Sequence, residues 1–185
     1  MTEAFIGRDV RTVEPLDGSD PQIGQWLWAM QEARRGLLEA VEGIGAEQLD
    51  WRGPSGADNS IGSLLYHVAL IEASWLYDDI FMREYPEDII ALFPLDHRTT
   101  DGRLMHVPDL PLTEHLQRLS FVRGRFLELL GAMAPEEWRR VRAPEGEDYA
   151  VSPAWVVYHL VEHEAGHLFE LRAGKRRWRE LRGMR

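Results

Sequence analysis

The segment that most constrains the fold is residues 152–171, because it predicts a helix that carries two histidines on one face. Ser152 is a favourable helix N-cap, and Pro153 suits the first helical position, where its missing N–H costs no hydrogen bond. Apolar side chains then recur at broadly helical spacing, at Val156, Leu160, Val161, Leu168 and Leu171. His163 and His167 are four residues apart, so their Cβ atoms lie roughly 5–6 Å from each other. We therefore expect both imidazoles to bind one metal ion.

The same periodicity predicts three further long helices. They span about residues 21–41, 60–85 and 113–133, with Thr113 expected to cap the last of them. Residues 86–111 carry four prolines and form a long crossover with a short helical piece at 87–92. Residues 134–138 read as a helical turn and 144–149 as a loop. The prediction is an all-α four-helix bundle with the long crossover between helices 2 and 3.

A third metal ligand is available at His67, in the second predicted helix. It lies at the border of the apolar stripe, about 40° around the helix from Ile71. A single histidine there is more often a hydrogen-bonded core residue, but the pair His163 and His167 favours a ligand. Three neutral imidazoles suit Zn, Ni, Fe or Cu. Three protein ligands with an open fourth position are typical of a catalytic site.

The pentapeptide from His163 to His167 also matches the His-Glu-x-x-His motif of zinc peptidases, with Glu164 as general base. Those enzymes take their third ligand downstream and hold the substrate along an edge strand. Here only eighteen residues follow His167, and no convincing alternating strand is found. A metallopeptidase is therefore the third functional hypothesis.

Length and composition limit the possible classes of protein. The chain of 185 residues suits one domain, which we place at 20–173, between an N-terminal extension (1–19) and a basic C-terminal tail (174–185). The absence of cysteine excludes disulfides and thiolate ligands. The net charge of −10 argues against general nucleic-acid binding. No apolar run has the length of a signal peptide or membrane span, so we expect a cytoplasmic protein without a membrane partner.

The C-terminal residues 172–185 contain seven cations and one carboxylate. This segment could form a patch for nucleic acid or an acidic partner. The favoured interpretation is that the cations lie at and beyond a helix C-terminus, where they suit the helix dipole.

Several stretches of the sequence resemble the DinB/YfiT superfamily. They are residues 34–38, residues 44–52 with their Gln-Leu-Asp-Trp-Arg turn, residues 59–68 with His67, and the late His163/His167 pair. The resemblance covers roughly residues 20–173. It implies four helices in up-down-down-up order, a dimer, and one divalent metal (Ni, Zn or Fe) held by His67, His163 and His167. Characterised relatives include transferases and isomerases that use mycothiol, bacillithiol or glutathione.

One departure from the family pattern limits what carries over. Relatives commonly continue the second histidine of the pair into Arg-Gly-Gln, whereas Leu168, Phe169 and Glu170 follow His167 here. The resemblance therefore still implies the three metal ligands, but it does not imply that this chain shares the substrate of its relatives.

Three other residues near the predicted ligands each have more than one possible role. Glu170 is a hydrogen-bond acceptor for a ligand N–H, an acid/base group, or only a solvated carboxylate. Glu164 is either a general base or a surface carboxylate. His159 is either a proton shuttle or substrate contact, or a satisfied interior histidine. His97, His106 and His115 show no metal-like spacing and receive no role. Trp26, Trp28 and Trp178 look exposed and predict a homodimer interface.

The sequence therefore favours a metal-dependent enzyme acting on a small molecule. The metal would lower the pKa of a bound water or thiol, in a transferase that depends on a low-molecular-weight thiol or in a hydrolase. Because the chain has no cysteine, a thiol cosubstrate would have to come from outside. The competing hypothesis is a non-catalytic metal-binding bundle with a stress-response or structural role, for which a closed four-ligand site would be evidence.

Overall fold

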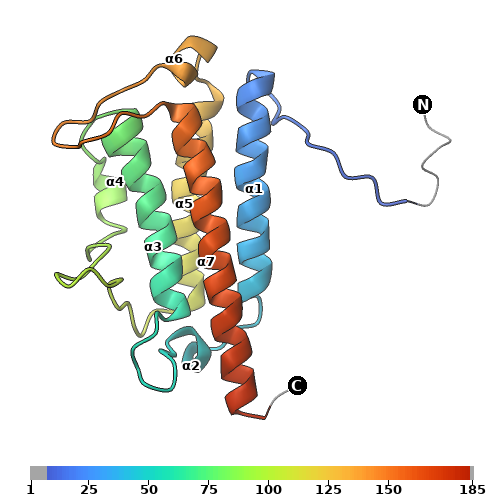
Figure 1. Ribbon diagram of the computed structural model, residues 1–185, viewed down its shortest axis with the longest axis vertical. Coiled ribbons are helices and arrows are strands. Elements are labelled where there is room, and N and C mark those ends of the chain that lie inside the picture. Colours follow the sequence, from blue (N-terminus) through green and yellow to red (C-terminus); the bar gives the residue numbers. More distant parts are fainter. Residues whose placement is uncertain (1–7, 184–185) are drawn as a thin grey trace.

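The computed structural model describes residues 8–183, and four long helices make up its body (Figure 1). They are α1 (Pro21–Val41), α3 (Ile61–Ser74), α5 (Leu112–Gly131) and α7 (Pro153–Leu181). Helices α1 and α7 run in one direction, and α3 and α5 run in the other, which is the predicted up-down-down-up order (Figure 1). Helix α1 packs mainly against α7, and α3 packs mainly against α5. The predicted all-α four-helix bundle is confirmed.

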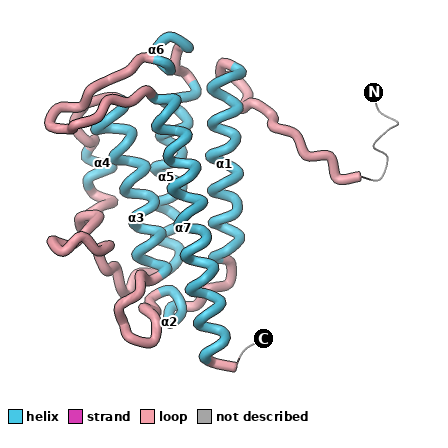
Figure 2. Tube along the Cα trace, in the orientation of Figure 1, coloured by secondary structure: helices cyan, strands magenta, loops and turns pink. Residues whose placement is uncertain are grey.

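Short helices lie in the connections between the long ones. They are α2 (Ala46–Leu49), α4 (Glu87–Ile90) and α6 (Pro135–Arg139). Apart from a π-helical segment that continues α3, the rest of the described chain is loop, without a strand; it holds two isolated β-bridges, Arg98–Leu104 and Arg142–Val151 (Figure 2). Of the predicted extension and tail, residues 1–7 and 184–185 lie outside the described residues. Helix α7 continues through residues 174–181 of the predicted tail.

Three of the long helices begin at polar caps. The side chain of Asp20 accepts hydrogen bonds from the N–H groups of Gln22 and Ile23. The hydroxyl of Ser60 accepts one from the N–H of Ser63, and the hydroxyl of Ser152 accepts one from the N–H of Trp155. These contacts satisfy N–H groups that have no partner within the helix. The cap predicted at Thr113 is wrong, because α5 begins one residue earlier, after Pro111.

A π-helix, η2 (Trp75–Ile80), continues α3 without a break. Its wider turn is visible in the hydrogen bond from the N–H of Phe81 to the carbonyl of Leu76, five residues back. Such segments are rare and are frequently found at functional sites. The π-helix could not be predicted from the sequence, because apolar periodicity does not separate a π turn from an α turn.

The core of the bundle consists of two hydrophobic clusters. One contains Ile23, Leu27, Met30, Leu76, Phe126 and Trp138, and the other contains Leu37, Val41, Leu65, Val68, Leu119 and Leu171. Near the place where the clusters meet, each long helix contributes one charged residue. These residues are Arg34, Glu72, Arg123 and Glu164, and each is at most 5% exposed.

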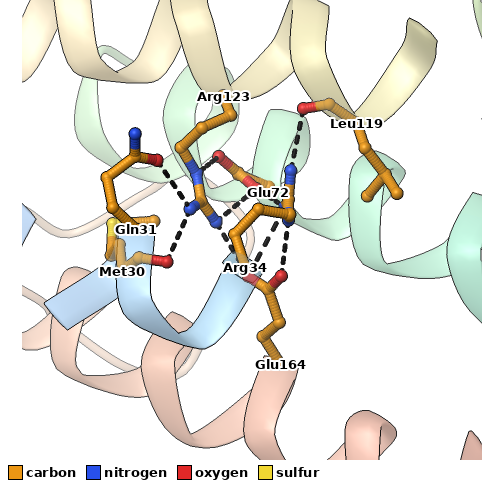
Figure 3. A network of polar contacts seen from close by, with 7 residues as sticks. All are labelled: Met30, Gln31, Arg34, Glu72, Leu119, Arg123 and Glu164. Atoms are coloured by element: carbon orange, nitrogen blue, oxygen red, sulfur yellow. Dashed lines mark hydrogen bonds and ion pairs between the residues drawn. The ribbon is translucent and has the colours of Figure 1, made fainter. Parts of the chain in front are cut away.

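The four charged residues form a closed network of ion pairs (Figure 3). Arg34 Nη2 lies 2.7 Å from Glu72 Oε2, and Arg123 Nε lies 2.6 Å from Glu72 Oε1. Both arginines also donate to Glu164, and Arg123 Nη2 lies 2.8 Å from its Oε2. Further N–H groups donate to the backbone carbonyls of Leu119 and Met30. We call these four residues the core ion network; it balances two cations with two carboxylates.

The crossover between η2 and α5 is held against α3. The hydroxyl of Tyr66 donates to the carbonyl of Leu95 at 2.6 Å and accepts from the N–H of Leu95 at 2.9 Å. Further along, the N–H of Val107 donates to the hydroxyl of Ser63. These contacts hold residues 96–106 beside the helix that carries His67.

The predicted exposure of the tryptophans is corrected. Trp178 is buried within the monomer, where its ring packs edge-on against Trp51 with centroids 5.5 Å apart. Trp26 and Trp28 are half-buried, and Trp26 packs edge-on against Tyr158. The homodimer itself stays a prediction. In the described chain, no helix combines the length and the apolar character that crossing a membrane requires.

Candidate metal centre

The structure brings the three predicted ligands together. His67 lies on α3, and His163 and His167 lie one turn apart on α7. The Nε2 atom of His163 lies 3.2 Å from that of His67 and 3.1 Å from that of His167. Ligand atoms of all three residues lie within 4.8 Å of one another. His67 is buried and the other two are half-buried, so the group lies between the helices and opens toward the surface.

The spacing of the three nitrogens fits a metal ion. Zinc–nitrogen bonds of about 2.0–2.1 Å in tetrahedral geometry put neighbouring nitrogens about 3.3 Å apart. The two measured Nε2 separations are close to this value. Three imidazole lone pairs that face one another repel unless a cation or a proton lies between them. The donor set suits Zn, Ni or Fe without selecting among them.

The surroundings of His67 and His163 keep these two imidazoles neutral. Burial, followed by the charges of His167 and His163, lowers the pKa of His67 to about 3. Burial, followed by the charges of His167 and His159, likewise lowers the pKa of His163 to about 3. A neutral imidazole is the form that binds a metal, so these two residues are in the ligand form at neutral pH.

Glu170 orients one of the ligands. Its Oε2 lies 3.2 Å from Nδ1 of His167, and its Oε1 accepts a hydrogen bond of 2.8 Å from Asn59 Nδ2. The hydrogen bond with His167 is the main reason that the pKa of Glu170 is lowered. A carboxylate that accepts from Nδ1–H fixes the tautomer and leaves Nε2 free to bind a metal. Of the two roles predicted for Glu170, this geometry favours the hydrogen-bond acceptor.

Glu164 belongs to the core ion network and does not face the metal centre. Its side chain is 2% exposed, and its two oxygens accept hydrogen bonds from Arg34 and Arg123 in the core ion network (Figure 3). A general base in a peptidase must instead face the water at the metal. The peptidase hypothesis also needs a substrate-binding strand, and residues 8–183 form none. The structure therefore supports neither a general-base role for Glu164 nor a peptidase.

An aromatic wall adjoins the metal centre on α7 and η2. The ring of His159 stacks on Trp155 with centroids 5.2 Å apart and meets Trp75 edge-on at 5.1 Å. Tyr149 adds a fourth ring, 5.9 Å from Trp75. His159 lies one turn before His163, with their ring centroids 6.1 Å apart. It is half-buried and held by aromatic rings, so it lies beside the centre and outside the ligand group.

Two residues of the crossover lie near the metal centre and were not predicted from the sequence to do so. The ring of His97 is 6.4 Å from that of His67. The positive charge of Arg98 contributes, after burial and the neighbouring histidines, to the lowered pKa values of His67 and His163. Neither residue sits in a periodic segment, so no sequence signal pointed to them. His106 and His115 are not part of the ligand group.

The chain is similar to known proteins in its sequence pattern and in its fold. The family model described as the DinB superfamily matches residues 29–171. No curated protein sequence matches the chain. Among solved structures, the chain is similar to YfiT from Bacillus subtilis, described as a probable metal-dependent hydrolase with an unusual four-helix bundle topology. The identity is 17%, the TM-score is 0.61, and the match covers 95% of this chain and 97% of that chain. At this identity, the similarity establishes the fold.

Proposed function

Because this chain belongs to the DinB superfamily, we propose that it is a metal-dependent enzyme that holds one divalent transition metal through His67, His163 and His167. The observation that carries the proposal is the position of His163 Nε2, 3.2 Å from that of His67 and 3.1 Å from that of His167, with ligand atoms of all three residues within 4.8 Å of one another. The structurally similar YfiT is described as a probable metal-dependent hydrolase, which also supports a metal-dependent enzyme.

A catalytic role is favoured over a structural one by the number of ligands. Structural zinc sites are usually closed by four protein ligands, whereas catalytic sites keep a position open. Within residues 8–183, the only group with metal-ligand spacing has three members. When bound, a divalent ion in such a site supplies a Lewis acid that lowers the pKa of a coordinated water or thiol.

The chain's own residues would contribute orientation and shape. Glu170 holds His167 in the tautomer that a ligand needs, and Asn59 in turn holds Glu170. The aromatic wall of Trp75, Trp155 and His159 borders the centre with polarizable apolar surface. We propose hydrolysis or thiol-dependent group transfer on a small molecule as the reaction class. A thiol cosubstrate would come from outside, since the chain contains no cysteine.

Elemental analysis of the purified full chain tests the metal site. We expect about one divalent metal per chain in the wild type and a sharp loss in His67→Ala, with the helical circular-dichroism spectrum retained. His159→Gln is the matched control, because this histidine lies one turn before His163 but outside the ligand group. It should keep the metal. Full metal content in His67→Ala would overturn the three-histidine site.

Activity is tested separately on the metal-loaded protein. Ester and amide hydrolysis, and the consumption of glutathione, bacillithiol or mycothiol with electrophilic substrates, are measured with and without a chelator. A turnover that the chelator and His67→Ala both abolish supports the enzyme. A metal-loaded protein that is inactive toward all of these would instead favour the non-catalytic bundle.

A further inference from the structure

A pocket of about 410 Å³ lies next to the metal centre, between the crossover and α7. Its wall includes Asn59 and Glu170, the two residues that orient His167. It also includes three arginines, Arg98 and Arg103 from the crossover and Arg177 from α7. In a chain with a net charge of −10, three arginines around one pocket are a marked local concentration of positive charge.

The carboxylates of this pocket are already engaged. Asp58 forms an ion pair with Arg177 at 2.5 Å. The two oxygens of Glu170 are occupied by Asn59 and His167. Asp58 and Arg177 therefore offset each other's charge, whereas Glu170, whose hydrogen-bond partners are an amide and an imidazole, keeps its negative charge beside the arginines of the crossover.

Arg98 and Arg103 are exposed, and few carboxylates of the described residues pair with them. Arg103 has one distant partner, Asp101, at 3.4 Å, and both residues of this pair are mostly exposed. Arg98 forms no ion pair with any carboxylate in the described part of the chain. Its guanidinium donates to the backbone carbonyl of Gly102, which uses one of five available N–H groups.

The backbone holds these two arginines in place. Arg98 and Leu104 form a β-bridge, and the N–H of Thr99 donates to the carbonyl of Arg103 at 2.9 Å. Gly102 makes the tight turn with a φ of 81°, which favours glycine. The turn is in turn held against α3 through Leu95 and Tyr66. The turn that carries the two arginines is therefore ordered. Both arginines line the pocket next to the metal centre.

We propose that this pocket binds a carboxylate or phosphate group of the substrate through Arg98 and Arg103, with the reacting end of the substrate directed toward His67, His163 and His167. The inference rests on the proposed metal-dependent function and adds to it the substrate class, a small molecule with an anionic group. Guanidinium groups match both oxyanions because they donate two parallel hydrogen bonds. Arg177 is paired with Asp58, so the positive charge available to the ligand comes from Arg98 and Arg103.

Isothermal titration calorimetry on the metal-loaded full chain tests this, with inorganic phosphate and succinate as separate probes. At low ionic strength we expect one of them to bind, and Arg98→Gln to weaken its binding about tenfold or more. The probe that binds distinguishes a phosphate site from a carboxylate site. Arg140→Gln is the matched control, because Arg140 is an exposed arginine at the end of α6, with no part in the pocket. It should bind as the wild type does.

A second arm separates the pocket from direct ligation of the metal. The titration is repeated on His67→Ala, which should lack the metal but keep the pocket. Binding that persists there and is lost on adding Arg98→Gln supports the proposal. The proposal is overturned if binding is lost in His67→Ala and is unchanged by Arg98→Gln. It is also overturned if neither probe binds. Elemental analysis of the same samples reports on the metal site independently, so failure of the two proposals can be told apart.

Discussion

His163 and Glu164 are consecutive residues of α7 whose side chains belong to different polar groups. The Nε2 atom of His163 lies 3.2 Å from that of His67, whereas the carboxylate of Glu164 lies 2.8 Å from Arg123 in the core ion network. A step of 100° around a helix accounts for the divergence. The metal centre and the core ion network are therefore adjacent on α7 but consist of different side chains.

The first prediction concerns protons and the metal. In the folded metal-free protein the pKa values of His67 and His163 are about 3, against ~6.5 for a free histidine. Protons therefore compete with the metal less than they would at free imidazoles. Metal content measured by equilibrium dialysis should persist below pH 6.5 for as long as circular dichroism reports a folded chain. Half of the metal being lost at or above pH 6.5 would contradict this.

The second prediction concerns His115, which is 1% exposed and has no hydrogen-bond partner at either ring nitrogen among the described residues. Burial, followed by the charge of Arg118, lowers its pKa to about 4. The unfolded chain therefore takes up a proton first, and stability falls as the pH drops from ~6.5 to about 4. The loss attributable to His115 is up to about 3 kcal/mol.

Urea titrations in the presence of a chelator measure this effect. The difference between wild type and His115→Leu isolates His115, because the metal ligands contribute equally to both proteins. The stability of the variant should depend less steeply on pH between 6.5 and 4. Parallel curves for the two proteins would rule out the predicted role of His115.

The third prediction concerns the core ion network. Arg123→Met removes the pairs with both Glu72 and Glu164 and leaves buried carboxylates with fewer partners. Breaking a buried pair in this way costs roughly 3–5 kcal/mol of unfolding free energy. Arg125→Met is the control on the same helix, since its pair with Asp88 is partly exposed and should cost about 1 kcal/mol or less. Equal denaturation midpoints for the two variants would refute the assignment.

The fourth prediction concerns the orientation of His167. Glu170→Ala removes the acceptor at Nδ1 and should weaken metal affinity about 10–100-fold, while saturating metal still gives full stoichiometry. Competition with a chromogenic chelator measures the affinity. Glu180→Ala, an exposed carboxylate further along α7, is the control and should change nothing. An unaltered affinity in Glu170→Ala would show that this hydrogen bond does not support the ligand.

The fifth prediction is a homodimer, as the family resemblance implies. Trp155, Tyr158 and Phe169 are exposed on α7, by 45%, 42% and 76%, and their spacing puts them within about 60° on one face. Burial of this face against a second copy would remove apolar surface from water. Light scattering at micromolar concentration should give twice the chain mass, and Phe169→Glu should lower it. A wild-type mass of one chain would exclude the dimer.

The long helices and the three histidines could be predicted because their signals are local. Ser152 and Pro153 mark the start of a helix, and the four-residue spacing of His163 and His167 fixes their common face. The role of Glu164 could not be read in the same way. Its position on the helix was evident, but its partners Arg34 and Arg123 come from two other helices.

The crossover was recognised as a loop, but its contribution to the site was not predictable. His97 and Arg98 are brought to the centre by the contact of Leu95 with Tyr66, which lie 29 residues apart. Such contacts depend on tertiary structure and leave no periodic pattern in the sequence. For the same reason, the sequence could not show that Trp178 packs against Trp51.

The core ion network also has a consequence for the axial alignment of the helices. Glu72 and Glu164 carry like charges and are joined only through Arg34 and Arg123, on α1 and α5. Sliding one helix by a turn, about 5.4 Å, would separate its charge from the other three. The relative height of α3 and α7, and with it the meeting of His67 with His163, is thus set by two helices that supply no ligand. Substitutions in α1 or α5 that shift this height would disturb metal binding from a distance.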